Sequence, residues 1–518
     1  MVSFSLPRVV VAGLAGSAGK TLVSTGLIRA FRRRGLRVAP FKKGPDYIDP
    51  AWLCRAAGYE ARSLDTFLMS EGAIIDSLEG ASGADIAVIE GNRGLFDGLD
   101  AKGTHSTAEL AKRIHAPLVL VIDVSKSTRT IAALVLGCLA LDPALPLAGV
   151  ILNRVGSSRH ERIIREAIAL VTSVPVLGAI PKLSFDHLPS RHLGLVMPDE
   201  REDRELALNA IGDAIDSSVD VEAIHCLAEQ APRIPSQVVV RSQILLTGRQ
   251  PRVGGGELCL PELVAGGFGD PSRVPITTIG ILRDKAFAFY YPENLAALEA
   301  QGAKLVPISP LRDTELPKID ALYAGGGYPE EHAAGLAANA QFRAALAARI
   351  AEGLPVWAEC GGLMYLATAL VCKGERYPMV GALPIEIEQT GHHQAHGYVE
   401  ACVDTENPFL PCGTQLRGHE FHFSRLVSDS APIKTALALG SGVGIGNGRD
   451  GIVVGRVFAS YLHLFAPGAP TWAPAFVRVA RKAQEALTQP TIGDTCGIHY
   501  STRRADRSRR GRVHSGAF

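Results

Sequence analysis

The chain has 518 residues, of which 47% are hydrophobic and 20% charged, and its formal net charge is +1. That length exceeds what one hydrophobic core supports, so at least two domains are expected, and the balanced charge gives no reason to expect nucleic acid or a membrane as partner. Nine cysteines at irregular spacing describe neither a disulfide framework nor a zinc site, and residues 1–7 lack a secretory signal, so the sequence predicts a cytoplasmic protein.

The first 200 residues alternate between apolar strands and helical patterns. Strands are predicted at 9–12, 37–41, 86–90, 118–123 and 148–153, and helices between them include 21–34, 106–114 and 159–170. This alternation is typical of βαβ units and a mostly parallel sheet. Residues 8–200 are therefore predicted to form one doubly wound α/β domain.

The first strand runs into a glycine-rich loop, GLAGSAGKT, at residues 13–21. Such a loop, between a strand and a helix, turns backbone N–H groups toward one point and suits a phosphate group. The lysine adds a positive charge and the threonine offers a hydroxyl to Mg²⁺. Although the loop is one residue longer than the Walker pattern, it predicts an ATP site formed by Gly16, Ser17, Gly19, Lys20 and Thr21.

Polar residues follow later strands of the same predicted sheet. Asp46 comes after the second strand and Glu90 ends the third. Because the carboxyl ends of parallel strands meet at one edge, these carboxylates are expected to hold Mg²⁺ with Thr21. The alternative for Asp46 is a turn-forming role after proline, and for Glu90 a helix-capping or surface role. Asn153, at the end of the fifth strand, is a candidate for binding the nucleotide base, or else a plain strand-end residue.

A second alternating series begins near residue 276, with strands predicted at 277–282, 304–308, 321–324 and 355–358. It predicts another doubly wound domain over 276–470. Residues 201–275 separate the two domains, as a helical segment followed by a linker rich in glycine and proline over 250–275. Residues 490–518 carry six arginines and are predicted to be a disordered tail, with a nucleic-acid-binding arm as the alternative.

A cysteine followed by two glycines stands after the strand at 355–358. Alone, Cys360 would be read as a buried core thiol, but a sulfur at a helix N-terminus is favoured as a thiolate. His463 could protonate a departing amine, and the backbone N–H groups of Gly326 and Gly327 could stabilise an oxyanion. Together these residues predict a thiol that hydrolyses glutamine.

These motifs resemble, in order and over residues 8 to about 470, those of the cobyrinic/hydrogenobyrinic acid a,c-diamide synthase family of cobalamin biosynthesis. The resemblance implies a P-loop, dethiobiotin-synthetase-like ATP domain joined to a class I-type glutamine amidotransferase domain. It implies Thr21, Asp46 and Glu90 as Mg²⁺ ligands, Cys360 as nucleophile and His463 as its activating histidine. The matching stretches are 41–50 (FKKGPDYIDP), 90–98, 152–156, 286–294 (AFAFYYPEN), 325–330, 358–366 and 418–424 (GHEFHFS).

One departure from class I amidotransferases concerns the histidine. Many of them carry a glutamate two residues after it, but here that position is Phe465. The sequence therefore predicts a cysteine–histidine dyad rather than a triad.

The activity that the resemblance implies combines both sites. ATP would activate the a and c carboxylates of cobyrinate or hydrogenobyrinate as acyl phosphates, and ammonia from L-glutamine would replace the phosphate. The corrin acid is expected beside Asp46, Tyr47 and Asp97, at the carboxyl ends of the first sheet. The alternatives are a sibling amidoligase, either nickel-sirohydrochlorin a,c-diamide synthase or cobyric acid synthase, and a nucleotide switch of the ParA/MinD type. The metal status of the corrin stays open, as does the oligomeric state, with a homodimer as one option.

Overall fold

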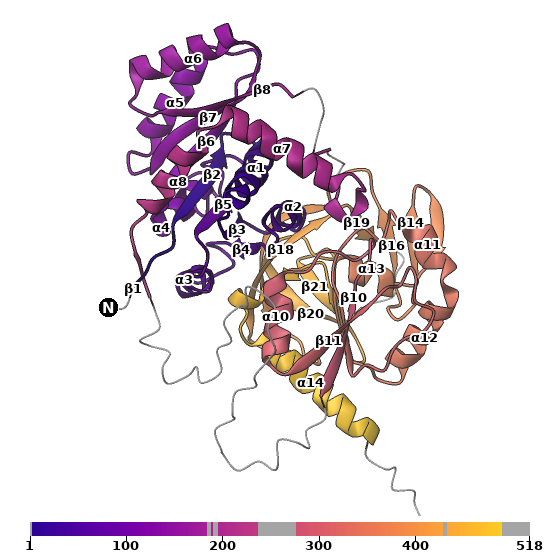
Figure 1. Ribbon diagram of the computed structural model, residues 1–518. Coiled ribbons are helices and arrows are strands. Elements are labelled where there is room, and N and C mark those ends of the chain that lie inside the picture. Colours follow the sequence, from indigo (N-terminus) through magenta and orange to yellow (C-terminus); the bar gives the residue numbers. More distant parts are fainter. Residues whose placement is uncertain (1–2, 184–187, 190–194, 237–275, 428–432, 489–518) are drawn as a thin grey trace, which may run out of the picture.

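The computed structural model describes residues 3–183, 188–189, 195–236, 276–427 and 433–488. The linker predicted over 250–275 and the tail predicted over 490–518 lie outside these residues. The described chain forms two α/β units that lie against each other (Figure 1). None of its helices combines the length and the apolar character needed to cross a membrane.

The first unit is built on seven strands, all parallel, in the order β4-β3-β5-β2-β6-β7-β8. Every residue of β2 and β5 is buried, as expected for a parallel sheet with helices on both faces. The doubly wound arrangement predicted for this half is thereby confirmed. The strands are β2 (Arg8–Gly13), β3 (Val38–Lys43), β4 (Arg62–Leu64), β5 (Ile86–Glu90), β6 (Leu118–Asp123), β7 (Leu147–Val155) and β8 (Val176–Pro181).

Among the described residues, this unit contains eight helices, and the last two come from the segment predicted only as helical. Within it, α7 packs on α1, where a side chain at Gly26 would meet Ile215 at 2.2 Å. Arg33 of α1 also forms ion pairs with Asp213 and Asp216 of α7. Buried side chains of α7 and α8 therefore complete the core of the first unit. The helices are α1 (Lys20–Arg33), α2 (Ile48–Ala57), α3 (Glu71–Glu79), α4 (Thr107–Arg113), α5 (Thr130–Leu141), α6 (Ser158–Val171), α7 (Arg204–Ser218) and α8 (Val221–Glu229).

The second unit contains a ten-stranded mixed sheet in the order β11-β10-β12-β13-β22-β21-β20-β17-β18-β23. Its first five strands are parallel and the others antiparallel, so the doubly wound part is extended by an antiparallel meander. The strands are β10 (Thr277–Leu282), β11 (Ala303–Ile308), β12 (Ala321–Ala324), β13 (Val356–Glu359), β17 (Ala395–Val403), β18 (Gln415–His422), β20 (Thr435–Ser441), β21 (Arg449–Val454), β22 (Val457–Ser460) and β23 (His463–Leu464).

Smaller elements complete the described residues. A four-stranded sheet has the order β15-β14-β16-β19, and β1 pairs with β9. These strands are β14 (Ala369–Cys372), β15 (Glu375–Pro378), β16 (Glu386–Gln389), β19 (Ser424–Leu426), β1 (Ser3–Phe4) and β9 (Ile234–Pro235). The helices of the second unit are α10 (Pro292–Ala300), α11 (Ala333–Ala338), α12 (Ala340–Ala351), α13 (Gly361–Leu366) and α14 (Trp472–Thr488), and the short 3₁₀ turns are η1 (Pro198–Glu200) and η3 (Ala466–Gly468).

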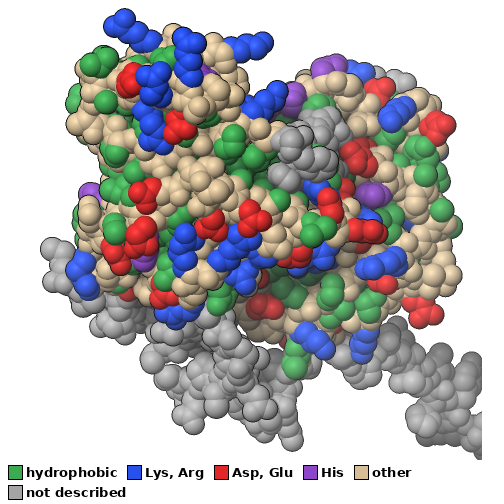
Figure 2. Space-filling model, turned by 45° about the horizontal axis from the view of Figure 1, so that its top comes forward, with side chains coloured by type: hydrophobic (Ala, Val, Ile, Leu, Met, Phe, Trp, Pro, Cys, Tyr) green, Lys and Arg blue, Asp and Glu red, His purple; other side chains and the backbone are tan. Residues whose placement is uncertain are grey.

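The two units share buried contacts. Tyr398 of β17 donates a hydrogen bond to Asp65 at 2.5 Å, and the side chain of Glu293 accepts one from the backbone of Ser63 at 2.9 Å. Tyr291 and Phe465 lie in the same apolar cluster as residues of the first unit. The carboxyl ends of the first sheet therefore face the second unit. On the molecular face seen in Figure 2, basic and acidic side chains are interspersed.

Candidate functional site

The glycine-rich loop joins β2 to α1. Gly19 has a φ of 99°, and a Cβ there would lie 2.2 Å from Nδ2 of Asn153, so only glycine fits. That Nδ2 donates a hydrogen bond to the carbonyl oxygen of Ala18 at 2.9 Å. Asn153 therefore braces the loop, and its contact with the nucleotide base stays a prediction. Nothing lies within 4 Å of the position of a Cβ on Gly16, which leaves that side of the loop open to a ligand.

The lysine of the loop is held by neutral oxygen atoms. The ammonium of Lys20 donates to the carbonyl oxygens of Ala15 at 3.0 Å and Arg93 at 2.7 Å. Burial and the neighbouring Lys42 lower the pKa of Lys20. Because neither hydrogen-bond acceptor is charged, a phosphate oxygen can replace them at little electrostatic cost.

A second lysine, which the sequence did not single out, lies among carboxylates. Lys42 at the end of β3 donates to Asp49 at 2.6 Å and to Glu90 at 2.9 Å, and its Nζ is 3.7 Å from Asp46. Burial lowers the pKa of Lys42, but the surrounding carboxylates raise it by more, so the residue stays a cation. Burial and the nearby Asp49 raise the pKa of Asp46 to about 7. Lys42 and Asp49 both lie in the stretch FKKGPDYIDP. A lysine at the end of an apolar strand was the one feature of the sequence that could have indicated a buried cation here.

The residues predicted to hold Mg²⁺ come together at this edge of the sheet. Thr21 donates to Oε1 of Glu90 at 2.7 Å, and Oε2 of the same buried carboxylate has no hydrogen-bond partner among the described residues. Hard oxygen ligands and an unsatisfied carboxylate oxygen fit Mg²⁺, which completes its shell with water and phosphate oxygens. The described residues contain no group of three or more histidine, cysteine, aspartate or glutamate side chains arranged to hold a metal.

The predicted nucleophile stands on a strained turn between β13 and α13. Cys360 has φ 47° and ψ −98°, and a Cβ on Gly362 would lie 2.1 Å from the carbonyl oxygen of Ala324. The glycine therefore lets the turn pack against β12, as in a nucleophile elbow. Burial and the Glu330 carboxylate raise the pKa of the Cys360 thiol, which opposes the effect expected from the helix N-terminus. The thiol consequently needs a base.

The predicted oxyanion turn lies next to the histidine and next to the turn that carries the cysteine. A Cβ on Gly326 would be 2.6 Å from Cε1 of His463, and a Cβ on Gly361 would be 3.0 Å from the backbone nitrogen of Gly327. The backbone of Gly326 and Gly327 therefore runs between His463 and the turn that carries Cys360. The structure brings these predicted residues together, and their catalytic roles stay predictions.

The residue before the nucleophile supplies a carboxylate to the histidine. Oε2 of Glu359 lies 3.6 Å from Nδ1 of His463, and that buried nitrogen has no hydrogen-bond partner among the described residues. Trp357 and Tyr323 fix the carboxylate by hydrogen bonds at 2.9 and 3.1 Å. A carboxylate at Nδ1 orients a histidine and stabilises its charged form. Glu359 is thus placed to serve as the third group that Phe465 does not provide.

Replacing Glu359 by glutamine is expected to lower kcat for glutamine hydrolysis by about 10²-fold, within the range of general acid–base catalysis, with little change in KM. Glutamine keeps the size of the side chain but not its charge. Amidation with ammonium chloride should stay normal, which a purely structural defect would not allow. Glu388→Gln, at a partly exposed residue of the same unit, is the control. Equal loss with both nitrogen sources would contradict this positioning role.

The stretch AFAFYYPEN holds the glycine turn and the histidine strand of the second site by hydrogen bonds. Gly325 donates its backbone N–H to the hydroxyl of Tyr290 at 2.8 Å, which fixes the glycine turn. The side chain of Asn294 donates to the carbonyl oxygen of Leu464 at 2.8 Å and accepts from the N–H of Ala466 at 2.7 Å. These bonds hold the short strand that carries the histidine.

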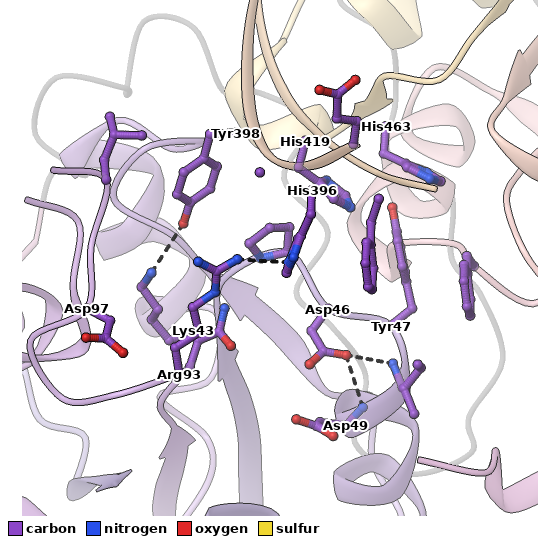
Figure 3. A pocket seen from close by; sticks show the side chains of 18 of the residues that line it. Lys43, Asp46, Tyr47, Asp49, Arg93, Asp97, His396, Tyr398, His419 and His463 are labelled. Carbon is purple, nitrogen blue, oxygen red and sulfur yellow. Dashed lines mark hydrogen bonds between the residues drawn. The ribbon is translucent and has the colours of Figure 1, made fainter. Parts of the chain in front are cut away.

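A cavity of about 460 Å³ lies between the two units (Figure 3). Its lining includes Asp46 and Asp49 of the first unit and His463 of the second. Tyr47 also lines it, with its ring stacked on Phe289 at 5.0 Å and 5.4 Å from the ring of His463. One cavity therefore joins the carboxylates beside the phosphate loop to the histidine of the thiol site.

Asp97, the remaining residue predicted to bind substrate, also lines the cavity. Its Oδ2 accepts a hydrogen bond from the N–H of Gly94 at 2.9 Å. Asp97 thus has a turn-forming contact as well as access to the cavity, and contact with substrate stays a prediction.

Comparisons with known proteins cover both units. The family model described as a CobQ/CobB/MinD/ParA nucleotide binding domain matches residues 9–196, and the one described as a CobB/CobQ-like glutamine amidotransferase domain matches residues 278–470. A protein from Magnetococcus marinus, described as cobyrinate a,c-diamide synthase, is 38% identical over 94% of this chain and 100% of its own length. Proteins of the same description from Syntrophotalea carbinolica and Methanothermobacter thermautotrophicus are 41% and 38% identical, over 92% and 91% of this chain and 99% of each relative.

Proposed function

Because this chain belongs to the cobyrinate a,c-diamide synthase family, we propose that it amidates the a and c carboxylates of cobyrinate with ATP and glutamine. The observation that supports this most directly is the cavity shared by the two units. It is lined by carboxylates next to the phosphate loop and by the histidine next to the thiol. A nucleotide switch would have no use for a connection between these two sites.

In the first unit, a carboxylate oxygen of the corrin would attack the γ-phosphorus of ATP, giving an acyl phosphate and ADP. Lys20 would stabilise the charge on the transferred phosphoryl group after leaving its two carbonyl partners. Mg²⁺, held by Thr21, Asp46 and Glu90, would supply charge neutralisation on the phosphates. Lys42 would hold those carboxylates close together and offset part of their mutual repulsion.

In the second unit, His463 would take the proton of Cys360 as the sulfur attacks the amide carbon of glutamine. The N–H groups of Gly326 and Gly327 would bind the resulting oxyanion, and the histidine would return the proton to the departing ammonia. Water then releases glutamate from the thioester. Ammonia in water near neutral pH is mostly ammonium, so passage through the cavity would keep it as a nucleophile. Its attack on the acyl phosphate expels phosphate and forms the amide.

The test is incubation of the protein with ATP, Mg²⁺ and glutamine against a panel of tetrapyrrole acids, with products identified by mass spectrometry. The proposal expects two amidations of cobyrinate. Comparison with hydrogenobyrinate shows whether cobalt is required. Amidation of nickel-sirohydrochlorin alone would favour the sibling enzyme, and ATP hydrolysis without any amide product would favour a nucleotide switch.

Asp46→Asn is expected to lower amidation by about 10²-fold or more, because a bound metal stabilises transition-state charge by several kcal/mol. Its melting temperature should change little, since asparagine can still accept the hydrogen bonds that Asp46 receives from Ile48 and Asp49 at the start of α2. Raised Mg²⁺ should restore part of the activity.

Glu90→Gln should lower activity as strongly and also destabilise the fold, because it removes the negative charge of a buried partner of Lys42. Asp220→Asn, at the N-cap of α8 where the side chain accepts a hydrogen bond from the backbone of Ala223, is the control and should change neither property. Normal turnover by the folded fraction of the Asp46 variant would favour the turn-forming role over the metal role.

A further inference from the structure

Arg93 lies in the loop between β5 and α4, on the wall of the cavity. Its φ of 48° is in the left-handed region, which side chains other than glycine seldom adopt and which often marks a functional position. Its carbonyl oxygen accepts the hydrogen bond from Lys20 at 2.7 Å. Figure 3 shows the side chain pointing to His396 rather than to Asp49.

The guanidinium is held by a residue of the other unit. It donates to Nε2 of His396 in β17 at 2.8 Å. Burial and the nearby Arg93 lower the pKa of His396 to about 4, so the imidazole is neutral at pH 7 and can accept this bond. The ring of His396 stacks on Phe421 at 4.3 Å. The pair of Arg93 and His396 therefore exists only when both units are in contact.

Arg93 differs from the other cation on the cavity wall. Lys43 lies 3.8 Å from the Asp65 carboxylate and donates to Tyr398 at 3.2 Å. Within the part of the chain that the structure describes, no carboxylate lies at ion-pair distance from Arg93. One of its five N–H donors is used by His396, and the others are available to a ligand.

We propose that Arg93, positioned by His396, binds a side-chain carboxylate of the tetrapyrrole other than the one being amidated. The inference rests on the proposed function, because it takes a tetrapyrrole polycarboxylate as the substrate. The reacting carboxylate must reach the phosphate loop near Lys20, so the remaining carboxylates need a partner elsewhere on the wall.

The chemistry of the wall fits such a ligand. A guanidinium matches a carboxylate with two parallel hydrogen bonds, and a side chain fixed in advance loses little conformational freedom on binding. Leu99, which lines the same cavity and is 52% exposed, offers apolar contact to the macrocycle.

The test measures the dissociation constants of two ligands for wild type and Arg93→Ala. One ligand is cobyrinate, and the other is its methyl ester in which every side-chain carboxylate is esterified. Loss of a hydrogen-bonded charge pair should weaken binding of the acid about 10- to 100-fold. Binding of the ester should be weak and equal for both proteins, because the ester has no carboxylate for Arg93 to bind. Arg425→Ala, an exposed arginine of β19 outside the cavity, should bind both ligands as wild type does.

Two more variants keep the test decisive if Arg93→Ala folds poorly. Arg93→Lys keeps the charge without the two-pronged geometry, and His396→Ala releases the arginine, so each should weaken acid binding by a smaller factor. Unchanged acid binding in all three variants would overturn the inference, as would an equal loss for acid and ester. If the wild-type protein neither binds nor amidates cobyrinate, the proposed function itself fails, which is a different result.

Discussion

Cys360→Ala is expected to abolish glutamine-dependent amidation and to leave amidation with ammonium chloride at elevated pH near the wild-type rate. The thiol serves only to release ammonia, whereas the carboxylate is activated at the phosphate loop of the other unit. The measurement compares amide formation with the two nitrogen sources in the variant and in wild type.

The matched control for this experiment is Cys372→Ala. Both cysteines are 6% exposed and belong to the same apolar cluster, but Cys372 lies in β14 and not on the strained turn. It should keep both activities, apart from a modest loss of stability. If Cys360→Ala lost both activities equally, the division of labour between the two units would be wrong.

Lys20→Ala is expected to remove amidation with either nitrogen source, by about 10²-fold or more, the scale seen when a preorganised group is removed from a transition state. Without this charge the acyl phosphate would not form. Because the side chain is 7% exposed, Lys20→Met serves as a second variant that keeps most of its volume. Equal losses in both variants would assign the effect to charge rather than packing.

Two further measurements complete the Lys20 test. Glutamine hydrolysis should persist in both variants, since the thiol site lies in the other unit. Lys112→Ala, at a partly exposed lysine of α4, should leave amidation unchanged. Near-normal amidation of Lys20→Ala with ammonium chloride would show that the loop is not the ATP site.

The sequence by itself determined both reactive loops. The phosphate loop and the cysteine turn each consist of an apolar strand, a few glycines and a reactive side chain that are adjacent along the chain. Their local geometry depends on neighbouring residues, so it can be predicted without knowing the rest of the fold. The alternation of strands and helices determined the α/β class for the same reason, because periodicity is a local property.

Contacts between distant segments were decided only by the tertiary structure. Lys42 meets Glu90 because β3 and β5 are neighbours in the sheet, and strand order is not written in any one strand. Glu359 reaches His463 because β22, which precedes the histidine by a few residues, pairs with β13, so the nearby carboxylate is distant in sequence while the position two residues after the histidine is Phe465. The pair of Arg93 and His396 depends on how two separate cores dock. Burial and charge at such contacts depend on three-dimensional packing, which hydrophobic periodicity along one chain does not specify.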